Sequence, residues 1–471
     1  MPPKSNHISM PPATSDQLEL SIQQIFSEAL AFHNSGQLNR AKAGYEQILT
    51  IQPNHFAALN LLSAIAMQTN QPQLAVDLIS KAIEVNPDVA SPYYNRGVML
   101  QKLKQHDDAI ASYDKAIALN PNYAAAYANR GVALKELKLT EAAVTCYNKA
   151  ISLDPDFADA HFNKSMVLLS EGDFERGWEL YEWRWKCASY TTPRRDFFQP
   201  RWNGAESISG KTILLHSEQG LGDTIQFCRY ARLVADLGAN VILEVEQPLV
   251  SLLSSSFGAQ HQVVAKGSIL PPFDIHCPLL SLPLAFKTTI ATIPSRQAYL
   301  RIDSSKVSKW ASKLCGSTKP RIGIVWSGRP AHTNDHNRSI KLFSLIPFIP
   351  YAFEYFSLQK EVREDDRATL HAYPNIRHFG DELEDFSDTA ALCEQMDIVI
   401  SVDTSVAHLS AAIGKATWVL LPSSPDWRWL LDREDSPWYP SARLFRQRNA
   451  GNWVDVFEEV NAALIALAKV P

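Results

Sequence analysis

Two carboxylates follow apolar, strand-like runs of the chain, at places where the side chains of open α/β sheets commonly meet a ligand. Asp223 ends the segment KTILLHSEQGLGD, in which the apolar run passes through a turn at Gly220 and Gly222 into a helix-like pattern. Asp403 ends the segment DIVISVD and also precedes a helix-like pattern. A carboxylate at such a place can remove a proton from a hydroxyl or accept hydrogen bonds from sugar hydroxyls.

The residues after Asp403 have the composition of an anion site. Thr404 and Ser405 stand at the expected helix start, and His408 follows on its first turn. Backbone N–H groups at a helix N-terminus, together with the two hydroxyls, can hold a diphosphate without a glycine-rich loop. Asp403 would then remain for sugar hydroxyls. The alternative is that one of these residues only caps the helix.

A third polar group follows the apolar run RIGIVW. Ser327 and Gly328 open a loop that contains Arg329 and Arg338, with two histidines between them. Cations beside a helix N-terminus would balance the charge of a leaving nucleotide diphosphate. A charge cluster on its own is more often a solvated loop, and the place of this one after a strand is what favours the functional interpretation.

The turn at Gly220 and Gly222 also permits a dinucleotide-binding interpretation, in which Glu244 stands near the distance expected for a ribose-binding acid. Ile225 replaces the third glycine of that fingerprint, and Asp223 places a negative charge where the pyrophosphate would lie. Because both features argue against dinucleotide binding, a dehydrogenase is only a distant alternative.

Parallel sheets are needed to position these residues, and the chain from residue 210 onward alternates strand and helix patterns. The strand-like runs are KTILLHSE, NVILEVE, HQVVA and DIHCP, then RIGIVWSG, FEYFSLQ, DIVISVDT and ATWVLLP. A short amphipathic helix near 304–314 separates the two series. We therefore predict two Rossmann-like domains, at 210–303 and 304–471, facing each other across a cleft.

The upstream part of the chain is a repeat with a period of 34 residues, marked by Pro53, Pro87, Pro121 and Pro155. Further columns read Ala41, Ala75, Ala109, Ala143 and Gly177; Tyr45, Ile79, Tyr113, Tyr147 and Tyr181; and Gly97 and Gly131. Small residues let paired helices approach, and the tyrosines fill the space between repeats. Residues 22–190 resemble the tetratricopeptide-repeat family, which implies an α-solenoid of about five repeats.

The fifth repeat departs from the pattern, because its second helix becomes the aromatic and charged run WELYEWRWK. A terminal repeat is expected to be atypical. We interpret Trp178, Trp183 and Trp185 as a surface that docks the array onto the next domain; the alternative is a simple cap. Residues 191–209, with prolines, charges and aromatic side chains, are predicted to be a linker.

A line of asparagines, Asn95, Asn129 and Asn163, recurs once per repeat on the first helices of repeats three to five. An asparagine side chain offers a donor and an acceptor to an extended peptide backbone. In this the array resembles that of protein O-GlcNAc transferases, where an asparagine ladder grips substrate chains. The resemblance implies a protein or peptide acceptor, and the alternative is a solvated polar stripe.

Residues 210–460 resemble the heptosyltransferase-like glycosyltransferases, inverting enzymes of the two-Rossmann-domain type called GT-B. The resemblance rests on the strand–GLGD–helix segment and on VDTSVAHL. It implies that Asp223 is the general base, and that Asp403, Thr404 and His408 contact the diphosphate and sugar of the donor. It also implies that the final helix, near 453–469, packs back on the first Rossmann-like domain.

The chain departs from that family at two places. Ser405 stands where the family has a glycine, and the family's phosphate-binding lysine has no clear equivalent. Arg338 is the best substitute and Arg329 the second, beside the donor-side loop that Ser327 and Gly328 open. On the acceptor side, the loop residues are Glu218, Gly220 and Gly222.

Three tryptophans, Trp427, Trp429 and Trp438, cluster with Arg428 after the last strong strand pattern. Their rings could stack on a nucleobase or a sugar. Packing is the more frequent reason for clustered tryptophans, so both interpretations stay open.

The composition excludes several classes of protein. A net charge of -5 and a pI near 6.2 give no electrostatic reason to expect nucleic acid or an anionic membrane as partner. Six widely spaced cysteines argue against a zinc site and for reduced thiols in the cytoplasm. No apolar run reaches the length of a membrane span or a signal peptide, and residues 1–21 are predicted to be disordered.

We therefore expect an α-solenoid followed by α/β domains, acting as an inverting glycosyltransferase. It would transfer a sugar from a nucleotide-diphospho-sugar to a protein or peptide held by the repeats, without a metal or other cofactor. The alternative of a different class is a protein–protein interaction scaffold whose glycosyltransferase domain is vestigial.

Overall fold

The computed structural model describes residues 15–258, 261–316, 319–332 and 334–468. Its contacts divide the chain into two compact units, Met1–Lys164 and Ser165–Pro471. The division falls inside helix α9 (Ala158–Glu171), upstream of the predicted end of the repeats at residue 190. Residues 1–14 of the predicted tail lie outside the described residues.

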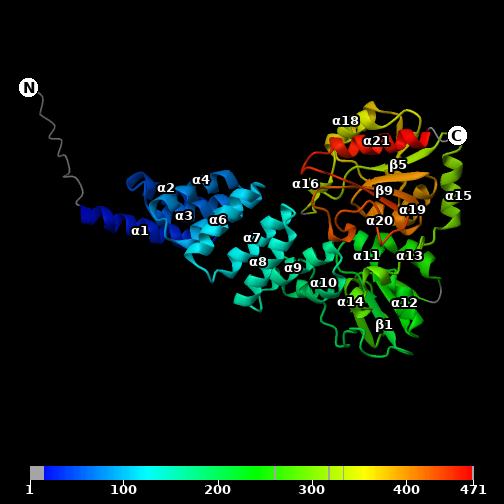
Figure 1. Ribbon diagram of the computed structural model, residues 1–471, viewed down its shortest axis with the longest axis horizontal. Helices are drawn as coiled ribbons and strands as arrows, with labels where there is room; N and C mark the ends of the chain where they lie inside the picture. The colour runs from blue at the N-terminus through cyan, green and yellow to red at the C-terminus, as the bar shows by residue number, and fades with distance from the viewer. Residues whose placement is uncertain (1–14, 259–260, 317–318, 333, 469–471) are drawn as a thin grey trace, which may run out of the picture. The chain divides into compact units, whose positions relative to one another are not determined.

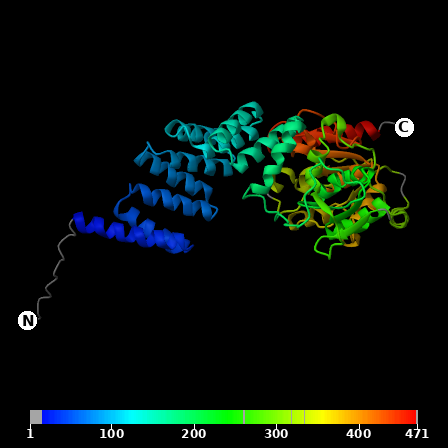
Figure 2. The same cartoon turned by 90° about the horizontal axis from the view of Figure 1, so that it is seen from below.

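The first unit is a series of antiparallel helix pairs, each stacked on the next (Figures 1 and 2). Its helices are α1 (Ser15–Asn34), α2 (Leu38–Ile51), α3 (Phe56–Gln68), α4 (Pro72–Val85), α5 (Ala90–Lys102), α6 (His106–Leu119), α7 (Ala124–Glu136) and α8 (Thr140–Leu153), followed by the start of α9. Because α1 begins at Ser15, residues 15–21, which were predicted to be disordered, are helical.

Packing between helices explains the columns of the repeat. The alanines of the small column and the aromatic residues Tyr45, Tyr113 and Tyr147 are fully buried. A Cβ on Gly97 would lie 2.5 Å from the ring of Tyr113, and one on Gly131 would lie 2.7 Å from the ring of Tyr147. A glycine at these positions therefore makes room for the tyrosine ring of the partner helix, as the pattern predicts.

The second unit begins with the remainder of α9, helix α10 (Phe174–Tyr181) and the 3₁₀ helix η1 (Glu182–Lys186). Its first sheet contains β1 (Thr212–His216), β2 (Asn240–Val245), β3 (Gln262–Ala265) and β4 (Ile275–Pro278), all parallel, in the order β3-β2-β1-β4. The main helices of this half are α11 (Leu221–Phe227), α12 (Tyr230–Asp236), α13 (Val250–Phe257) and α14 (Leu282–Ala285).

The second sheet has six parallel strands in the order β10-β9-β8-β5-β6-β7, which is the doubly wound order. The strands are β5 (Arg321–Val325), β6 (Glu354–Ser357), β7 (Ile376–His378), β8 (Ile398–Val402), β9 (Ala416–Leu421) and β10 (Ala442–Arg446). The helices are α15 (Ser304–Lys313), α16 (Asp335–Arg338), α17 (Leu342–Leu345), α18 (Glu364–Ala372), α19 (Phe386–Glu394), α20 (Ser405–Ala412) and α21 (Val454–Ala468).

The final helix does not pack as expected. Val456, Phe457, Val460 and Leu464 of α21 are buried in the core of the second sheet, in one cluster with Phe445. Helix α21 thus completes the half that contains its own sheet, and the expectation that it returns to the first half is wrong. Figure 1 shows α21 beside the second sheet.

The predicted linker packs along the first sheet. The backbone N–H of Trp202 donates to the carbonyl of His276 at 2.8 Å, and Arg195 forms an ion pair with the buried Glu244. The ring of Phe197 lies 4.8 Å from that of His276 and 5.6 Å from that of His216. Residues 195–202 therefore belong structurally to the first sheet.

The two sheets meet through helices that follow their strands. Helix α11, after β1, packs against α20, after β8 (Figure 1). Helix α13 packs against α19, where the hydroxyls of Ser251 and Ser387 lie 3.2 Å apart. The α11–α20 contact brings the two candidate acids of the sequence into one region.

Candidate functional site

Asp223 stands in the first turn of α11, after the loop that leaves β1. One carboxylate oxygen accepts a hydrogen bond from the backbone N–H of Gly220 at 2.8 Å. The other forms an ion pair with the guanidinium of Arg428. The side chain is 18% exposed, so that Asp223 is held at the edge of the protein interior by one donor from each half of the second unit.

Arg428 lies in the 3₁₀ helix η8 (Trp427–Trp429), which follows β9. Its Nη1 donates to Asp426 at 2.8 Å, and its guanidinium carbon lies 4.4 Å from the ring centre of Trp427. Burial opposes the charge of Arg428, but Asp426 and Asp223 hold its pKa above the ordinary range. The sequence did not place Arg428 or Asp426 in the site, because only the fold brings them to Asp223.

Asp403 directly follows the last residue of β8. Thr404 comes next and precedes Ser405, the first residue of α20. The hydroxyl of Thr404 lies 3.0 Å from that of Ser401. Burial, aided by the negative Asp426 and opposed by Arg338, raises the pKa of Asp403 to about 6. With this pKa, Asp403 is about half protonated at pH 6 and mostly ionised at pH 7, so in mildly acidic solution it can donate as well as accept hydrogen bonds.

His408 is fixed on three sides. Its Nδ1 lies 2.9 Å from the hydroxyl of Tyr439, its Nε2 lies 3.8 Å from Asp403, and its ring stacks on Trp429 at 5.2 Å. Burial and the nearby Arg428 lower the pKa of His408 to about 3. The imidazole is therefore neutral at physiological pH and serves as a hydrogen-bonding group.

Gly222 joins the two halves of the site. A Cβ on Gly222 would lie 2.8 Å from Cδ2 of His408 and 3.6 Å from Cα of Ser405. The second glycine of the turn therefore permits close approach of α11 to the first turn of α20. Gly220, in contrast, acts through its backbone N–H, which binds Asp223.

Arg338 adds a second cation beside Asp403. Its Nη1 donates to the backbone carbonyl of Asp403 at 2.9 Å, and its guanidinium lies against Gly328, where a Cβ would be 3.0 Å from Nη2. Ser327 is turned away, because its backbone N–H and hydroxyl contact Gln359 at 3.0 and 3.2 Å. Of the predicted donor-side loop, Arg338 thus reaches Asp403, and Gly328 lies against its guanidinium.

The remaining arginine and the two histidines of this loop are exposed. Arg329, His332 and His336 all lie at the surface. Partial burial and the positive charge of Arg338 lower the pKa of His332, which also interacts electrostatically with Asp426 and Asp223. His332 therefore borders the site, and no contact in the described residues places the side chain of Arg329 in it.

Glu218 has a different position from the one that the acceptor-side prediction gave it. Its carboxylate accepts two hydrogen bonds at 3.0 Å from the fully buried Arg184, one from Tyr190 at 2.9 Å and one from the backbone N–H of Leu280 at 3.2 Å. This ion pair ties η1 to the first sheet. The carboxylate has little capacity left for an acceptor.

The tryptophans form a packed core behind the site. Trp427, Trp429 and Trp438 are at most 2% exposed, so they are not open to a nucleobase, and packing is the correct interpretation. Trp178 of α10 packs edge-on against Trp427 at 5.2 Å and donates to the carbonyl of Thr288 at 3.0 Å. Of the three predicted docking residues, Trp178 is buried, whereas Trp183 and Trp185 are half-buried.

Glu244 does not fit the dinucleotide interpretation. Its side chain is fully buried and forms an ion pair with Arg195 of the linker. A ribose-binding acid must be reachable by the ligand, so this placement removes the second feature on which the dehydrogenase alternative depends.

The asparagine line lies on α5, α7 and α9, and Asn95, Asn129 and Asn163 are all half-buried. The amide of Asn129 donates to the hydroxyl of Tyr94 at 2.9 Å, which leaves its carbonyl oxygen as an acceptor. The ring of Tyr94 lies 4.9 Å from that of Tyr123. Asn129 is therefore fixed by the preceding repeat.

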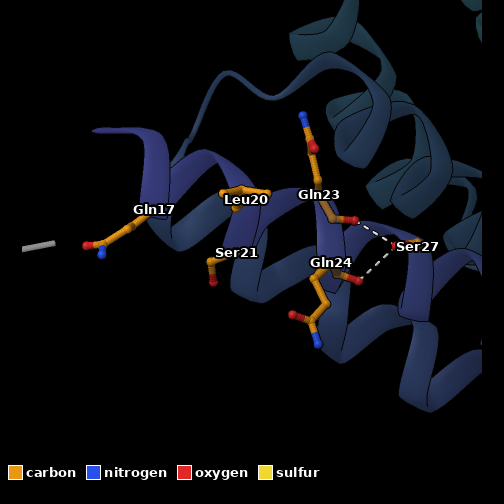
Figure 3. A pocket seen from close by; sticks show the side chains of 6 residues that line it. All are labelled: Gln17, Leu20, Ser21, Gln23, Gln24 and Ser27. Carbon is orange, nitrogen blue, oxygen red and sulfur yellow. Dashed lines mark hydrogen bonds between the residues drawn. The ribbon is translucent and has the colours of Figure 1, made fainter. Parts of the chain in front are cut away.

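A surface depression on α1 is lined by one helix alone. Figure 3 shows its six residues, Gln17, Leu20, Ser21, Gln23, Gln24 and Ser27. The hydroxyl of Ser27 donates to the carbonyls of Gln23 and Gln24 at 2.8 and 3.1 Å, as a helical serine commonly does. The depression contains none of the predicted site residues.

Two kinds of feature are absent from the described residues. No helix among them has the length and apolar character needed to cross a membrane. In the same part of the chain, no three side chains of histidine, cysteine, aspartate or glutamate gather as metal ligands would.

Comparison with protein families identifies tetratricopeptide repeats in residues 90–123, 124–157 and 146–179. Such repeats commonly bind protein or peptide partners. A curated relative, the protein FlbA of Caulobacter vibrioides, is 27% identical over 328 residues, which cover 64% of this chain and 54% of FlbA. The chain thus spans about half the length of this relative.

Several solved structures resemble about one third of the chain. MamA is 24% identical, with a TM-score of 0.32, over 33% of this chain and 91% of MamA. PilF of Pseudomonas aeruginosa is 19% identical, with a TM-score of 0.33, over 35% and 76% of the two chains. By the family matches, residues 90–179 are tetratricopeptide repeats, and two parallel sheets follow them in the chain.

Proposed function

We propose that the protein is an inverting glycosyltransferase that uses a nucleotide-diphospho-sugar and a protein or peptide acceptor. The observation that carries the proposal is the α11–α20 contact, which places Gly222, the neighbour of Asp223, against His408, whose Nε2 lies 3.8 Å from Asp403. A group that activates an acceptor and a group that binds a donor must come this close for transfer to occur.

The reaction is a single displacement. The Asp223 carboxylate takes the proton of the acceptor hydroxyl while the oxygen forms a bond to the anomeric carbon of the sugar. The bond from that carbon to the phosphate oxygen breaks, and its electron pair leaves with the nucleoside diphosphate. Attack opposite to the leaving group inverts the anomeric centre. No metal is needed in this step, because Arg428 and Arg338 can balance the charge of the leaving group.

Each residue of the second half has a role in the proposal. The neutral His408 and the partly protonated Asp403 donate hydrogen bonds to the sugar or the diphosphate, and Thr404 and the N-terminus of α20 add further donors. The repeats, through Asn95, Asn129 and Asn163, hold the acceptor chain. A positioned base of this kind contributes about 10²- to 10⁴-fold to the rate.

The test is ligand-induced stabilisation of the full chain. All eleven tryptophans lie beyond residue 164, so tryptophan fluorescence follows the unfolding of the second unit alone. A nucleotide-diphospho-sugar at about 100 times its Kd should raise the free energy of unfolding by about 2.7 kcal/mol. A CMP-linked sugar, which lacks a diphosphate, is the matched control. With the donor identified, Asp223→Asn should reduce turnover by about 10²- to 10⁴-fold.

A protein–protein interaction scaffold is the second candidate. The observation that favours it is that both oxygens of Asp223 already have donors, together with the presence of Ser405 where the resembling family has glycine. If no nucleotide-diphospho-sugar stabilises the second unit, the scaffold replaces the enzyme as the proposed function. The repeats would then carry the activity, as a binding surface for a partner protein.

A further inference from the structure

We infer that Arg428 binds the diphosphate of the donor, and that the donor must take Arg428 from Asp223 before Asp223 can act as a base. The inference rests on the proposed function, because it concerns the order of binding at the same site. It assigns the phosphate-binding cation to η8, a segment that contains none of the residues predicted for that role.

Arg428 is anchored by its own segment. Asp426 accepts hydrogen bonds from Nη1 at 2.8 Å and from the backbone N–H of Arg428 at 3.0 Å. Trp427 packs against the guanidinium, and the side chain is 9% exposed. These contacts do not involve Asp223. Arg428 therefore keeps its position when Asp223 leaves, and its Nη2 becomes available to another anion.

The backbone holds this segment firmly. Leu430, directly after η8, has φ 55° and ψ -175° and is buried. A residue other than glycine adopts this conformation only when its surroundings impose it, at a cost of about 1–3 kcal/mol. Arg446 contributes by donating to the carbonyl of Trp429 at 2.6 Å. The protein thus maintains a strained turn that presents Arg428 to Asp223.

Asp223 occupies the place of a phosphate oxygen. Guanidinium groups bind carboxylates and phosphates through the same N–H donors, so the two anions compete for one partner. Both oxygens of Asp223 are engaged here, one by Gly220 and one by Arg428. Without a donor substrate, the base is therefore paired; with its diphosphate on Arg428, one oxygen of Asp223 is freed.

The freed oxygen is the one that takes the acceptor proton. As the acceptor oxygen bonds to the anomeric carbon, the carbon–oxygen bond to the phosphate breaks and its electron pair leaves on the nucleoside diphosphate. Arg428 then balances the charge of that leaving group, while the proton remains on Asp223. One cation thereby couples donor binding to the readiness of the base, so the donor binds before the acceptor reacts.

The test measures the affinity of the full chain for UDP, GDP, CDP, ADP and dTDP by titration calorimetry. For the nucleotide that binds, Asp223→Asn should tighten binding by about 3- to 10-fold, because Arg428 loses its competing anion. Arg428→Met should weaken binding by at least about 10-fold. Arg433→Met is the matched control, because Arg433 forms an exposed ion pair with Asp435 in the same segment, and it should leave affinity unchanged.

The outcomes separate this inference from the proposed function. If a nucleotide binds the natural protein but Asp223→Asn does not tighten it, the competition is absent and the inference is wrong, while the glycosyltransferase proposal stands. If none of the five nucleotides binds, both fail. Should Arg428→Met not fold, the Asp223→Asn measurement decides alone, because asparagine has nearly the same shape as aspartate and its single amide oxygen can still accept a hydrogen bond from Gly220.

Discussion

Gly222 and His408, which lie on helices from different halves of the second unit, are so close that a Cβ on the glycine would stand 2.8 Å from Cδ2 of the imidazole. The ring cannot easily move away, because Tyr439 binds its Nδ1 and Trp429 stacks on its face. This contact sets the distance between the proposed base and the proposed donor site.

Gly222→Ala should therefore destabilise the second unit. Overpacking costs about 1–3 kcal/mol, offset in part by the better helix propensity of alanine. Urea unfolding followed by tryptophan fluorescence measures the change. In a double-mutant cycle, the same substitution in a His408→Ala background should cost little, because the ring is gone. An equal cost in both backgrounds would place the clash elsewhere.

Asp403 should make the stability of the second unit depend on pH. A carboxyl whose folded pKa is raised from 3.8 to about 6 keeps its proton in the folded protein while the unfolded chain loses it. Stability is therefore lost as the pH rises from about 4 to about 6, and the loss stays constant at higher pH, where both states have released the proton. Asp403→Asn lacks this loss, so its advantage over the natural protein should grow through that range, to about 3 kcal/mol at pH 8.

Unfolding of both proteins in urea between pH 4.5 and pH 8 measures this difference, again by tryptophan fluorescence. Taking the difference cancels the titration of groups common to both proteins, Asp426 among them. A constant difference between the two proteins across the range would show that Asp403 ionises as an ordinary surface acid does.

Glu218 should act on stability rather than on the acceptor. Its pair with Arg184 is fully buried, and removing one partner of such a pair costs about 3–5 kcal/mol. Glu218→Gln should therefore lower the urea midpoint of the second unit, whereas Glu179→Gln, on the exposed side of α10, should not. If Glu218→Gln keeps its stability but loses transfer activity, the original acceptor-side assignment is correct.

The sequence predicted the strands of both sheets well, because buried parallel strands read as nearly continuous apolar runs. The two strands it missed are the edge strands β7 and β10. The first has only three residues, and the second, ARLFR, carries an arginine at position 443 that is exposed. Short or charged edges lack the apolar signal on which such a prediction depends.

The site was predictable only where its residues follow strands. Asp223 and Asp403 could be found from their positions after β1 and β8, whereas Arg428 is 205 residues from its partner Asp223. Glu218 stands after the same strand as Asp223, but Arg184, from the end of the repeats, binds its carboxylate. Such pairings depend on how segments fold together, and no local pattern records them.

The asparagine line is the proposed link between the repeats and the acceptor. Each side chain that binds a peptide backbone contributes about 0.5–1.5 kcal/mol, so single replacement of Asn95, Asn129 or Asn163 by alanine should weaken binding by about 2- to 10-fold. A peptide selected from a displayed library against the full chain serves as the probe, and fluorescence anisotropy measures its affinity. Asn148→Ala, an exposed position on α8, is the matched control.

Asn129 distinguishes a binding ladder from a solvated stripe, because Tyr94 already fixes its amide nitrogen at 2.9 Å. Tyr94→Phe removes that partner without touching the carbonyl oxygen, so the asparagine becomes free to rotate and should lose part of its contribution to peptide affinity. A triple variant replaces Asn95, Asn129 and Asn163 by alanine. If it and Tyr94→Phe both bind the peptide as tightly as the natural protein does, the asparagines are only a solvated stripe. Other residues of the array must then hold the acceptor.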